Sequence, residues 1–315
     1  MKTVSIKNGR LEVDIRVPDG SNEPDFCRFD EGCRIERVVF DGHSFCRPEQ
    51  ILKTRRTSEG YGLVYEWVMA DGSFGAKSGE YFPKLGIGKL RQDADGADYD
   101  IFKRYGAERS KLTFKEDGNA LKVTEDLPEC RGIGARIVRT VTVQGDRLTV
   151  ATEVTSTGTG AVRAREYGHN FVALDDAPTG PEYVLTMHCL KDVSSLSIKS
   201  IALTPEGRDD HYTESPFALS ESAIGFTRKL DNEAIFVSGG QEDIKDQGSE
   251  TDMKCMWTLS GKSCPVSISE WTSFSPARYA IWGNEQCICP EIFTEIKLMP
   301  GETESFIREY RFESR

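Results

Sequence analysis

The stretch that decides the fold is residues 137–154, IVRTVTVQGDRLTVATEV. Two runs rich in valine and threonine flank the short polar segment Gln144-Gly145-Asp146. Branched side chains of this kind suit a pleated surface, and a glycine between two such runs is typical of a tight turn. The stretch therefore predicts a β-hairpin with long strands.

The same period of two recurs along the chain. Apolar and charged residues alternate over residues 11–17, and Leu112 and Phe114 lie across an Asp117-Gly118 turn from Leu121 and Val123. Strict alternation indicates half-buried strands. Helical periodicity is weak, and the segment 218–230 has room for at most a turn or two. We therefore expect less than about 10% helix.

The chain is long for a single domain, at 315 residues, but nothing in its sequence divides it. Glycine and proline turns are spread evenly, without a linker rich in serine or glycine and without a repeat of 20–50 residues. Large all-β domains reach this length. We predict one all-β domain over residues 1–315, built from two broad antiparallel sheets packed face to face.

Charge and hydropathy exclude several classes of partner. The net charge is −11, from 51 acidic and 40 basic residues, so phosphate backbones and anionic lipids are repelled. No apolar run approaches the roughly 20 residues of a membrane span. The first residues show no continuous apolar region and predict no signal peptide. Neither nucleic acid nor membrane is expected as a partner, and nothing indicates an oligomeric state.

The cysteines point to a reducing compartment and to no metal centre. There are nine, an odd number, and they are scattered without a CxxC pair. This pattern fits free thiols in the cytoplasm better than a disulfide framework. Cys287 and Cys289 are interpreted as small core residues. Gly86-Ile87-Gly88 is followed by Arg91 where a dinucleotide fingerprint has its third glycine, so we predict no cofactor. Because the chain has no CxxC pair and only four histidines, we predict no metal.

The most unusual stretch is residues 166–175, EYGHNFVALD. On a strand, Tyr167, His169 and Phe171 share one face, so the imidazole lies between two aromatic rings. One interpretation is a core histidine with a single hydrogen bond. The other is a general acid or base beside rings that stack on a sugar, because imidazole titrates near neutral pH.

A second stretch of interest is residues 275–293, which holds Arg278, Trp282 and Glu291. Glu291 follows a proline and lies between apolar neighbours. It is either an edge residue or a carboxylate in a pocket, where partial burial raises its pKa and makes it a usable base. Trp282 is interpreted as an aromatic wall or core residue.

In combination, these stretches resemble the galactose mutarotase-like (aldose 1-epimerase) superfamily. The resemblance rests on the order and spacing of blocks that span most of the chain: Arg28-Phe29-Asp30, residues 79–90, residues 99–105, residues 167–175, Cys289-Pro290-Glu291, residues 298–303 and Tyr310-Arg311-Phe312. It implies a β-supersandwich that binds a monosaccharide in a cleft on one sheet, with a small-molecule sugar as its partner.

The resemblance also implies a chemistry, the interconversion of the anomers of a free aldose. A carboxylate takes the proton of the C1 hydroxyl while a histidine protonates the ring oxygen; by motif these are Glu291 and His169. The two need opposite protonation states, which a raised pKa of Glu291 and a charged His169 would supply. Tyr61 takes the place of a second pocket histidine. Further candidates for binding the sugar are Tyr167, Trp282, Arg28 and Arg278, with Arg34 and Arg56 as possible substitutes among the arginines.

Two other functions remain open on the same scaffold. One is another carbohydrate-active enzyme, such as a lyase or an epimerase that acts on an unusual or acidic sugar. Basic residues in the pocket would favour an acidic sugar, because a carboxylate or phosphate needs a cation nearby. The other is a sugar-binding protein without catalysis, which would be favoured if His169 and Glu291 lay too far apart to flank one ring.

Overall fold

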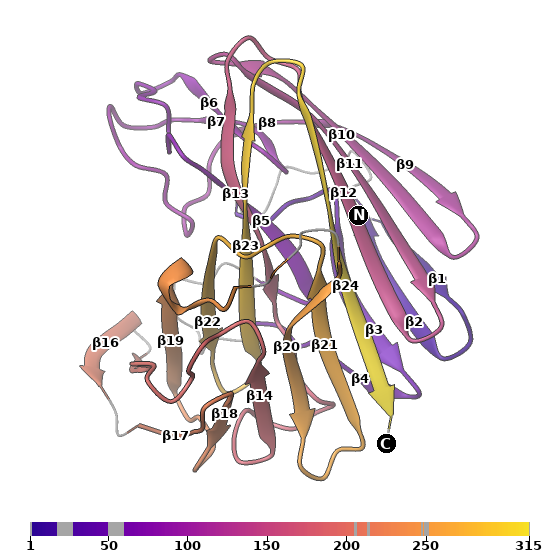
Figure 1. Cartoon of the computed structure of the whole chain (residues 1–315). Helices are drawn as coiled ribbons and strands as arrows, with labels where there is room; N and C mark the ends of the chain where they lie inside the picture. The colour runs from indigo at the N-terminus through magenta and orange to yellow at the C-terminus, as the bar shows by residue number, and fades with distance from the viewer. Residues whose placement is uncertain are drawn as a thin grey trace.

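The computed structural model describes residues 2–17, 28–49, 60–204, 207–212, 215–246, 248 and 252–314. These residues form two broad β-sheets and one small sheet (Figure 1). All strand pairings in this part of the chain are antiparallel, as expected for alternating strands joined by short turns.

The first broad sheet has eleven strands and takes them from both ends of the chain. In spatial order they are β1 (Lys2–Lys7), β2 (Leu11–Val17), β3 (Arg34–Phe40), β5 (Leu63–Met69), β13 (Val162–Asn170), β23 (Ile288–Leu298), β22 (Arg278–Gly283), β19 (Glu233–Gly239), β15 (Lys199–Thr204) and β16 (Gly207–Tyr212), with β4 (His43–Ser44) paired to β3.

The second broad sheet has ten strands and packs against the first. In spatial order they are β17 (Phe217–Leu219), β18 (Ala223–Phe226), β14 (Tyr183–Met187), β20 (Lys254–Gly261), β21 (Val266–Thr272), β24 (Thr303–Ser314), β12 (Arg147–Ser156), β11 (Ile133–Gln144), β10 (Ala120–Cys130) and β9 (Lys111–Asp117).

The remaining elements are small. A third sheet comprises β6 (Tyr81–Lys84), β7 (Gly88–Arg91) and β8 (Ala107–Arg109). Helix in the described residues is confined to the 3-10 turn η1 (Gln241–Asp243), which confirms the expected low helix content. No helix of the described chain has the length and apolar character needed to cross a membrane.

The strands predicted from the sequence are present. Residues 137–154 lie in the β11–β12 hairpin, where Gly145 takes the left-handed backbone angle (φ 61°) that the turn requires. The hairpin around Asp117-Gly118 is the β9–β10 pair. The segment 218–230, which had room for at most a turn or two of helix, holds no helix, because β17 and β18 pair with each other across this region.

The core lies between the two broad sheets and follows the alternation of the strands. Inward residues of the eleven-stranded sheet, such as Val13, Ile35 and Ile281, are fully buried with Val141, Leu259 and Phe312 of the ten-stranded sheet. Burying side chains of this kind stabilises the folded chain by roughly 1.5–3 kcal/mol each. The opposite, outward face of the eleven-stranded sheet does not contribute to this core.

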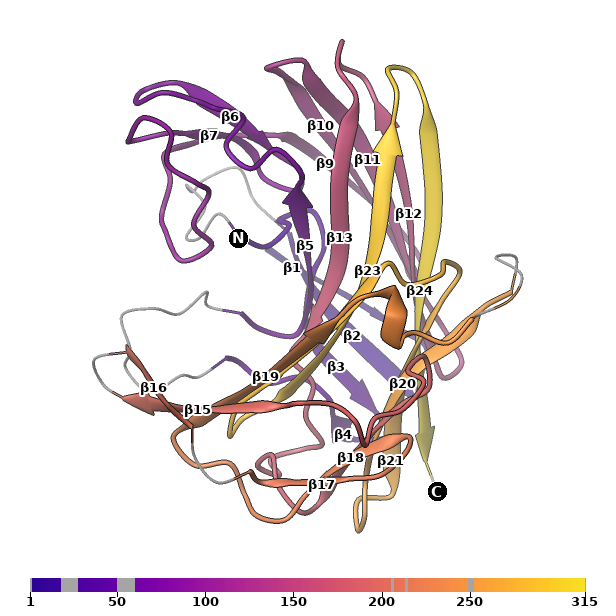
Figure 2. The ribbon, with the colours of Figure 1, turned by 60° about the vertical axis from the view of Figure 1, so that its left-hand side comes forward.

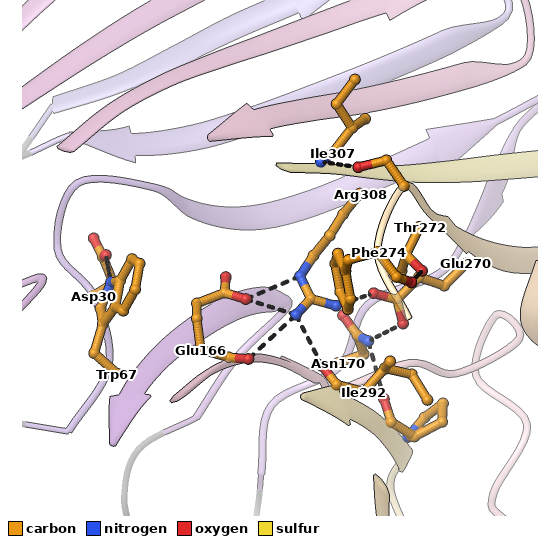
Figure 3. Close-up of polar contacts among 12 residues, drawn as sticks. Asp30, Trp67, Glu166, Asn170, Glu270, Thr272, Phe274, Ile292, Ile307 and Arg308 are labelled. Atoms are coloured by element: carbon orange, nitrogen blue, oxygen red, sulfur yellow. Dashed lines mark hydrogen bonds and ion pairs between the residues drawn. The ribbon is translucent and has the colours of Figure 1, made fainter. Parts of the chain in front are cut away.

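A buried ionic network also joins the two sheets (Figure 3). The guanidinium of Arg308 on β24 donates to Glu166 Oε2 at 2.6 Å, to Glu270 Oε1 at 2.6 Å and to the carbonyl of Ile292 at 2.8 Å. Glu270 also accepts a hydrogen bond from the indole of Trp257 at 2.5 Å. We name Arg308, Glu166 and Glu270 the inner network.

The eight cysteines in the described part of the chain are free thiols, as predicted. Cys27 lies outside the described residues. Cys287 and Cys289 are fully buried, in agreement with their interpretation as core residues. A cytoplasmic location stays a prediction.

Candidate active site

The register of the eleven-stranded sheet aligns the candidate residues in adjacent rows. One row runs Glu66, Tyr167, Phe293 and Arg278 across β5, β13, β23 and β22. The bridge between Val172 and Ile288 keeps the β13–β23 register further along. The next row therefore places His169 opposite Glu291, and Glu291 pairs with Ala280 on β22.

His169 and Glu291 lie side by side on the outward face of this sheet. The Nε2 atom of His169 is 3.2 Å from the Oε1 atom of Glu291, and both side chains are more than nine-tenths buried. The imidazole stacks on Phe171 with ring centroids 4.3 Å apart, and Phe29 meets its edge at 5.5 Å. These rings fix the orientation of the imidazole. We name the two residues the proton pair.

A cavity of about 290 Å³ opens over the proton pair, close to the lower end of the roughly 300–1,000 Å³ of small-molecule sites. Its lining comes from the central strands, from β15 and β19, from the segment between β7 and β8, and from the segments before β3 and after β4: Arg28, Glu49, Ile101, Phe102, Tyr167, His169, Ile201, Ala234, Phe236, Arg278, Ala280, Trp282, Glu291 and Phe293. Figure 2 shows β15 and β19 and the small sheet on the same side of β5, β13 and β23.

Burial shifts both members of the proton pair toward their neutral forms. It raises the pKa of Glu291 to about 8, against the opposing pull of the Arg28 guanidinium. Burial, with Arg28 adding to the effect, holds the pKa of His169 well below its ordinary value. The expectation of a charged His169 is therefore wrong for the free site. These two shifts favour a single proton on the pair at neutral pH, carried by Glu291.

Arg28 lies in the cavity wall within an ionic cluster that extends beneath it. Its Nε donates to Glu66 Oε2 at 2.6 Å and its Nη2 donates to the Tyr167 hydroxyl at 3.1 Å. The hydroxyl of Tyr167 donates to Glu66 as well, and Lys84 Nζ lies 3.7 Å from Glu66 Oε1. Although burial opposes it, the two cations hold the pKa of Glu66 below its ordinary value.

Arg278 lies at the other end of the same row, half-buried at the cavity. Its Nη2 donates to the hydroxyl of Ser238 at 3.1 Å, and its guanidinium lies 5.4 Å from the centroid of the Phe293 ring. No carboxylate of the described residues lies within ion-pair distance of Arg278.

The other residues predicted for sugar binding divide between the cavity and its surroundings. Trp282 and Tyr167 line the cavity. Tyr61 and Arg34 are not among the lining residues; Tyr61 is half-buried and bridges to Pro48. Arg56 lies outside the described residues.

The sequence did not single out two carboxylates of this region, Glu49 in the cavity wall and Glu66 beneath it. Glu66 is a buried carboxylate within the otherwise apolar strand LVYEWVM, a pattern that could have identified it. Glu49 Oε2 accepts a hydrogen bond from the amide of Gly60 at 3.2 Å. Nothing in its sequence surroundings sets it apart, because only the fold brings it to the cavity.

One group of side chains in the described residues has the donors for a metal ion. His43, Asp175 and Cys264 place a ligand atom each within 4.8 Å of one another, and all three are half-buried. Hydrogen bonds already account for their proximity, since Asp175 contacts His43 Nδ1 at 2.8 Å and accepts from the Ser44 amide at 2.9 Å. None of the three lines the cavity.

Comparison with known proteins gives structural matches only. No family model and no curated protein matches the sequence. A galactose mutarotase-like protein from Clostridium acetobutylicum superposes with a TM-score of 0.59 at 14% identity, over 99% of this chain and 95% of the other. One from Lactobacillus casei gives 0.57 at 13%, over 99% and 100%. A GalM/aldose epimerase homologue from C. elegans gives 0.55 at 12%, over 99% of both chains.

These likenesses extend over 99% of the chain and confirm the fold that the sequence resemblance implies. The chain has the galactose mutarotase-like fold, a β-supersandwich of large antiparallel sheets. At such low identity the fold does not determine an activity, which has to be argued from the site.

Proposed function

We propose that this protein is an aldose 1-epimerase, an enzyme that interconverts the two anomers of a free sugar with His169 and Glu291 as its proton carriers. The observation that supports this best is the 3.2 Å separation of His169 Nε2 and Glu291 Oε1 at a cavity. The reaction moves protons at the C1 hydroxyl and the ring oxygen, two atoms bonded to the same carbon. Two adjacent proton carriers match them.

The proton count of the pair suits the reaction. Ring opening removes one proton from the C1 hydroxyl, adds one to the ring oxygen and breaks the bond between C1 and that oxygen. A pair that holds a single proton gives one and takes one, so its total is unchanged. After rotation about the bond between C1 and C2, the reverse transfers close the ring on the other face. Glu291 as base and His169 as acid require the pair's proton to move first to the imidazole, over the 3.2 Å between them.

The rest of the cavity is suited to hold a sugar ring over the pair. Trp282, Phe236 and Phe293 supply apolar faces for the C–H side of a pyranose, and Arg28 and Glu49 supply polar groups for its hydroxyls. A volume of about 290 Å³ favours a monosaccharide over a longer chain.

A second candidate, an epimerase or lyase that acts beside a sugar carboxylate, is favoured by Arg278 in the cavity wall. Such an enzyme removes a proton from carbon, and a cation next to the carboxylate makes that proton more acidic. In deuterated water it would exchange a carbon-bound proton, whereas anomer exchange leaves every C–H bond intact.

The test measures anomer exchange directly, by saturation-transfer NMR on a panel of free aldoses and their acidic derivatives. Glu291→Gln and His169→Asn should each slow the exchange by about 10²–10⁴-fold, the usual share of general acid–base catalysis. The double variant should be barely slower than either single variant, because both residues act in one ring opening. Trp282→Ala is the control; it should weaken binding more than it slows the bound sugar.

An exchange rate of Glu291→Gln within about twofold of the wild type would show that Glu291 is not the base. If the wild type exchanged no sugar that it binds, the non-catalytic sugar-binding function would replace the proposed one.

A further inference from the structure

We propose that the sugar taken by this cavity carries an anionic group, a carboxylate or a phosphate ester, and that Arg278 binds it. The inference names the substrate class of the site and rests on the proposed function only in taking the ligand to be a sugar. It comes from the position and the pairing of Arg278, which differ from those of the other arginines at the centre of the fold.

The first observation is that Arg278 forms no ion pair with a carboxylate of the described residues. Within the described residues, Arg28, Arg139 and Arg308 each form an ion pair with a carboxylate. Arg278 is half-buried, whereas Arg139 and Arg308 are fully buried, and its contacts are the hydroxyl of Ser238 and the ring of Phe293. Keeping a cation partly out of water without an anion costs free energy, and a ligand's anion would recover it.

The second observation is where Arg278 lies relative to the proton pair. Ala280 pairs with Glu291, and Arg278 is two residues further along β22, on the same face. Diagonal neighbours of this kind are about 7–8 Å apart at the backbone, which is on the scale of one sugar ring with its exocyclic carbon. A pyranose with C1 at the proton pair can therefore direct a substituent from its far side to Arg278.

The third observation is the charge around the cavity. Among the described residues, the charged side chains that line it are two cations, Arg28 and Arg278, and two carboxyl groups, Glu49 and Glu291. Glu291 adds no full charge at neutral pH because burial raises its pKa to about 8. The cavity is thus positive in a chain of net charge −11, and a positive cavity concentrates anions.

The guanidinium also has the shape for this role. Its planar fork binds carboxylate and phosphate oxygens in pairs, and such charge-assisted bonds are stronger than those to a neutral hydroxyl. A neutral sugar would leave Arg278 without its partner and would be discriminated against.

The experiment compares three matched ligands, glucose, glucuronate and glucose 6-phosphate, together with their galactose and mannose counterparts. Binding is measured by calorimetry to the wild type, Arg278→Gln and Arg278→Lys. The control is Arg163→Gln, which removes the same charge from an exposed site four residues from Tyr167 on the same strand face, away from the cavity. Thermal unfolding checks that each variant is folded.

We expect at least one anionic sugar to bind about 10–100-fold more tightly than its neutral counterpart. Arg278→Gln should abolish that preference, Arg278→Lys should keep part of it, and Arg163→Gln should leave it intact. Whether the carboxylate or the phosphate ester binds identifies the group. The inference is overturned if no anionic sugar is preferred at millimolar concentration, or if folded Arg278→Gln keeps the preference.

Anomer exchange, measured on the same ligands, separates this inference from the proposed function. Preferred binding of an anionic sugar without exchange would overturn the epimerase and leave the role of Arg278. Anomer exchange of neutral and anionic sugars with equal efficiency would support the epimerase and overturn the role of Arg278.

Discussion

The two faces of strand β13 carry buried ionisable groups that differ in how they are paired. On the inward face Glu166 belongs to the inner network, where Arg308 donates to it, to Glu270 and to a carbonyl. One oxygen, Glu166 Oε1, has no hydrogen-bond partner among the described residues. On the outward face, the Nδ1 atom of His169 is buried without a hydrogen-bond partner in the part of the chain that the structure describes, and Nε2 contacts Glu291.

This difference in pairing distinguishes ionisable groups that stabilise the fold from ionisable groups that can exchange protons. A cation that is hydrogen-bonded to two carboxylates compensates their burial and ties the two sheets together. The proton pair has no such cation between its members, so burial favours the neutral forms and leaves a proton that can move. Groups that are incompletely paired cost stability where they lie, which is typical of sites that react.

The largest expected effect comes from removing the cation of the inner network. Arg308→Met should lower the free energy of unfolding by about 3–5 kcal/mol, because two carboxylates are then buried without compensation. Urea denaturation followed by tryptophan fluorescence measures the loss. A variant that also carries Glu166→Gln and Glu270→Gln removes the uncompensated charges and should regain much of the stability. A loss under about 1 kcal/mol in Arg308→Met would mean that the network is not structural.

Replacing glutamate by glutamine should change the free energy of unfolding in opposite directions on the two faces. Glu166→Gln removes a partner of Arg308 and should cost about 1.5–3 kcal/mol. Glu291→Gln should stabilise the protein at neutral pH, because it removes a carboxyl group that the fold keeps protonated.

The pH dependence of that second change follows from the raised pKa of Glu291. The folded protein holds this proton up to about pH 8 whereas the unfolded chain releases it near its ordinary value, so wild-type stability falls as pH rises between the two. Glutamine does not titrate, so the advantage of Glu291→Gln should grow by up to about 1.4 kcal/mol per pH unit in this window. Urea denaturation midpoints of the wild type and Glu291→Gln, measured from pH 5 to pH 8, test this. A constant difference between the two proteins over this range would contradict the prediction.

The pH profile of anomer exchange tests whether the pair works with one proton. Exchange should decrease above about pH 8, by about tenfold per unit, as Glu291 loses the proton. It should also decrease on the acid side, well below the ordinary pKa of histidine, when His169 gains a second proton for the pair. A rate that keeps rising beyond pH 9 would contradict a shared proton and indicate that Glu291 must be ionised beforehand.

How much of this was predictable depends on whether the information is local. The period of two fixed the hairpins β9–β10 and β11–β12, because alternation along a strand is written in neighbouring residues. His169 and Glu291 stood out as polar residues in aromatic stretches. Their 3.2 Å contact needed the register between β13 and β23, strands about 120 residues apart, and no local pattern encodes that.

The protonation states of His169 and Glu291 could not be predicted from the sequence for a related reason. Burial of His169 by Phe171 and Phe29 sets its pKa, and Phe29 comes from a segment 140 residues earlier. Tyr61 was selected by alignment with a motif, yet its backbone bridge to Pro48 holds it outside the cavity lining. Local sequence identified which groups can react; the fold decides which of them meet.

The smallest expected effect concerns Phe236, an outward residue of β19 that lines the cavity and is 38% exposed. It packs little against the core, so Phe236→Ala should change the free energy of unfolding by no more than about 0.5 kcal/mol. A stacked ring is worth about 0.5–1.5 kcal/mol, so the affinity for the sugar should fall by roughly 2–12-fold. The matched control is Val68→Ala, an exposed apolar residue of β5 on the same face of the sheet that does not line the cavity; it should leave both quantities unchanged. Calorimetry gives the affinities and urea denaturation the stabilities. If Phe236→Ala lowered stability while leaving affinity intact, Phe236 would belong with the inward residues, and the division between a structural and a reactive face would not hold at this edge of the cavity.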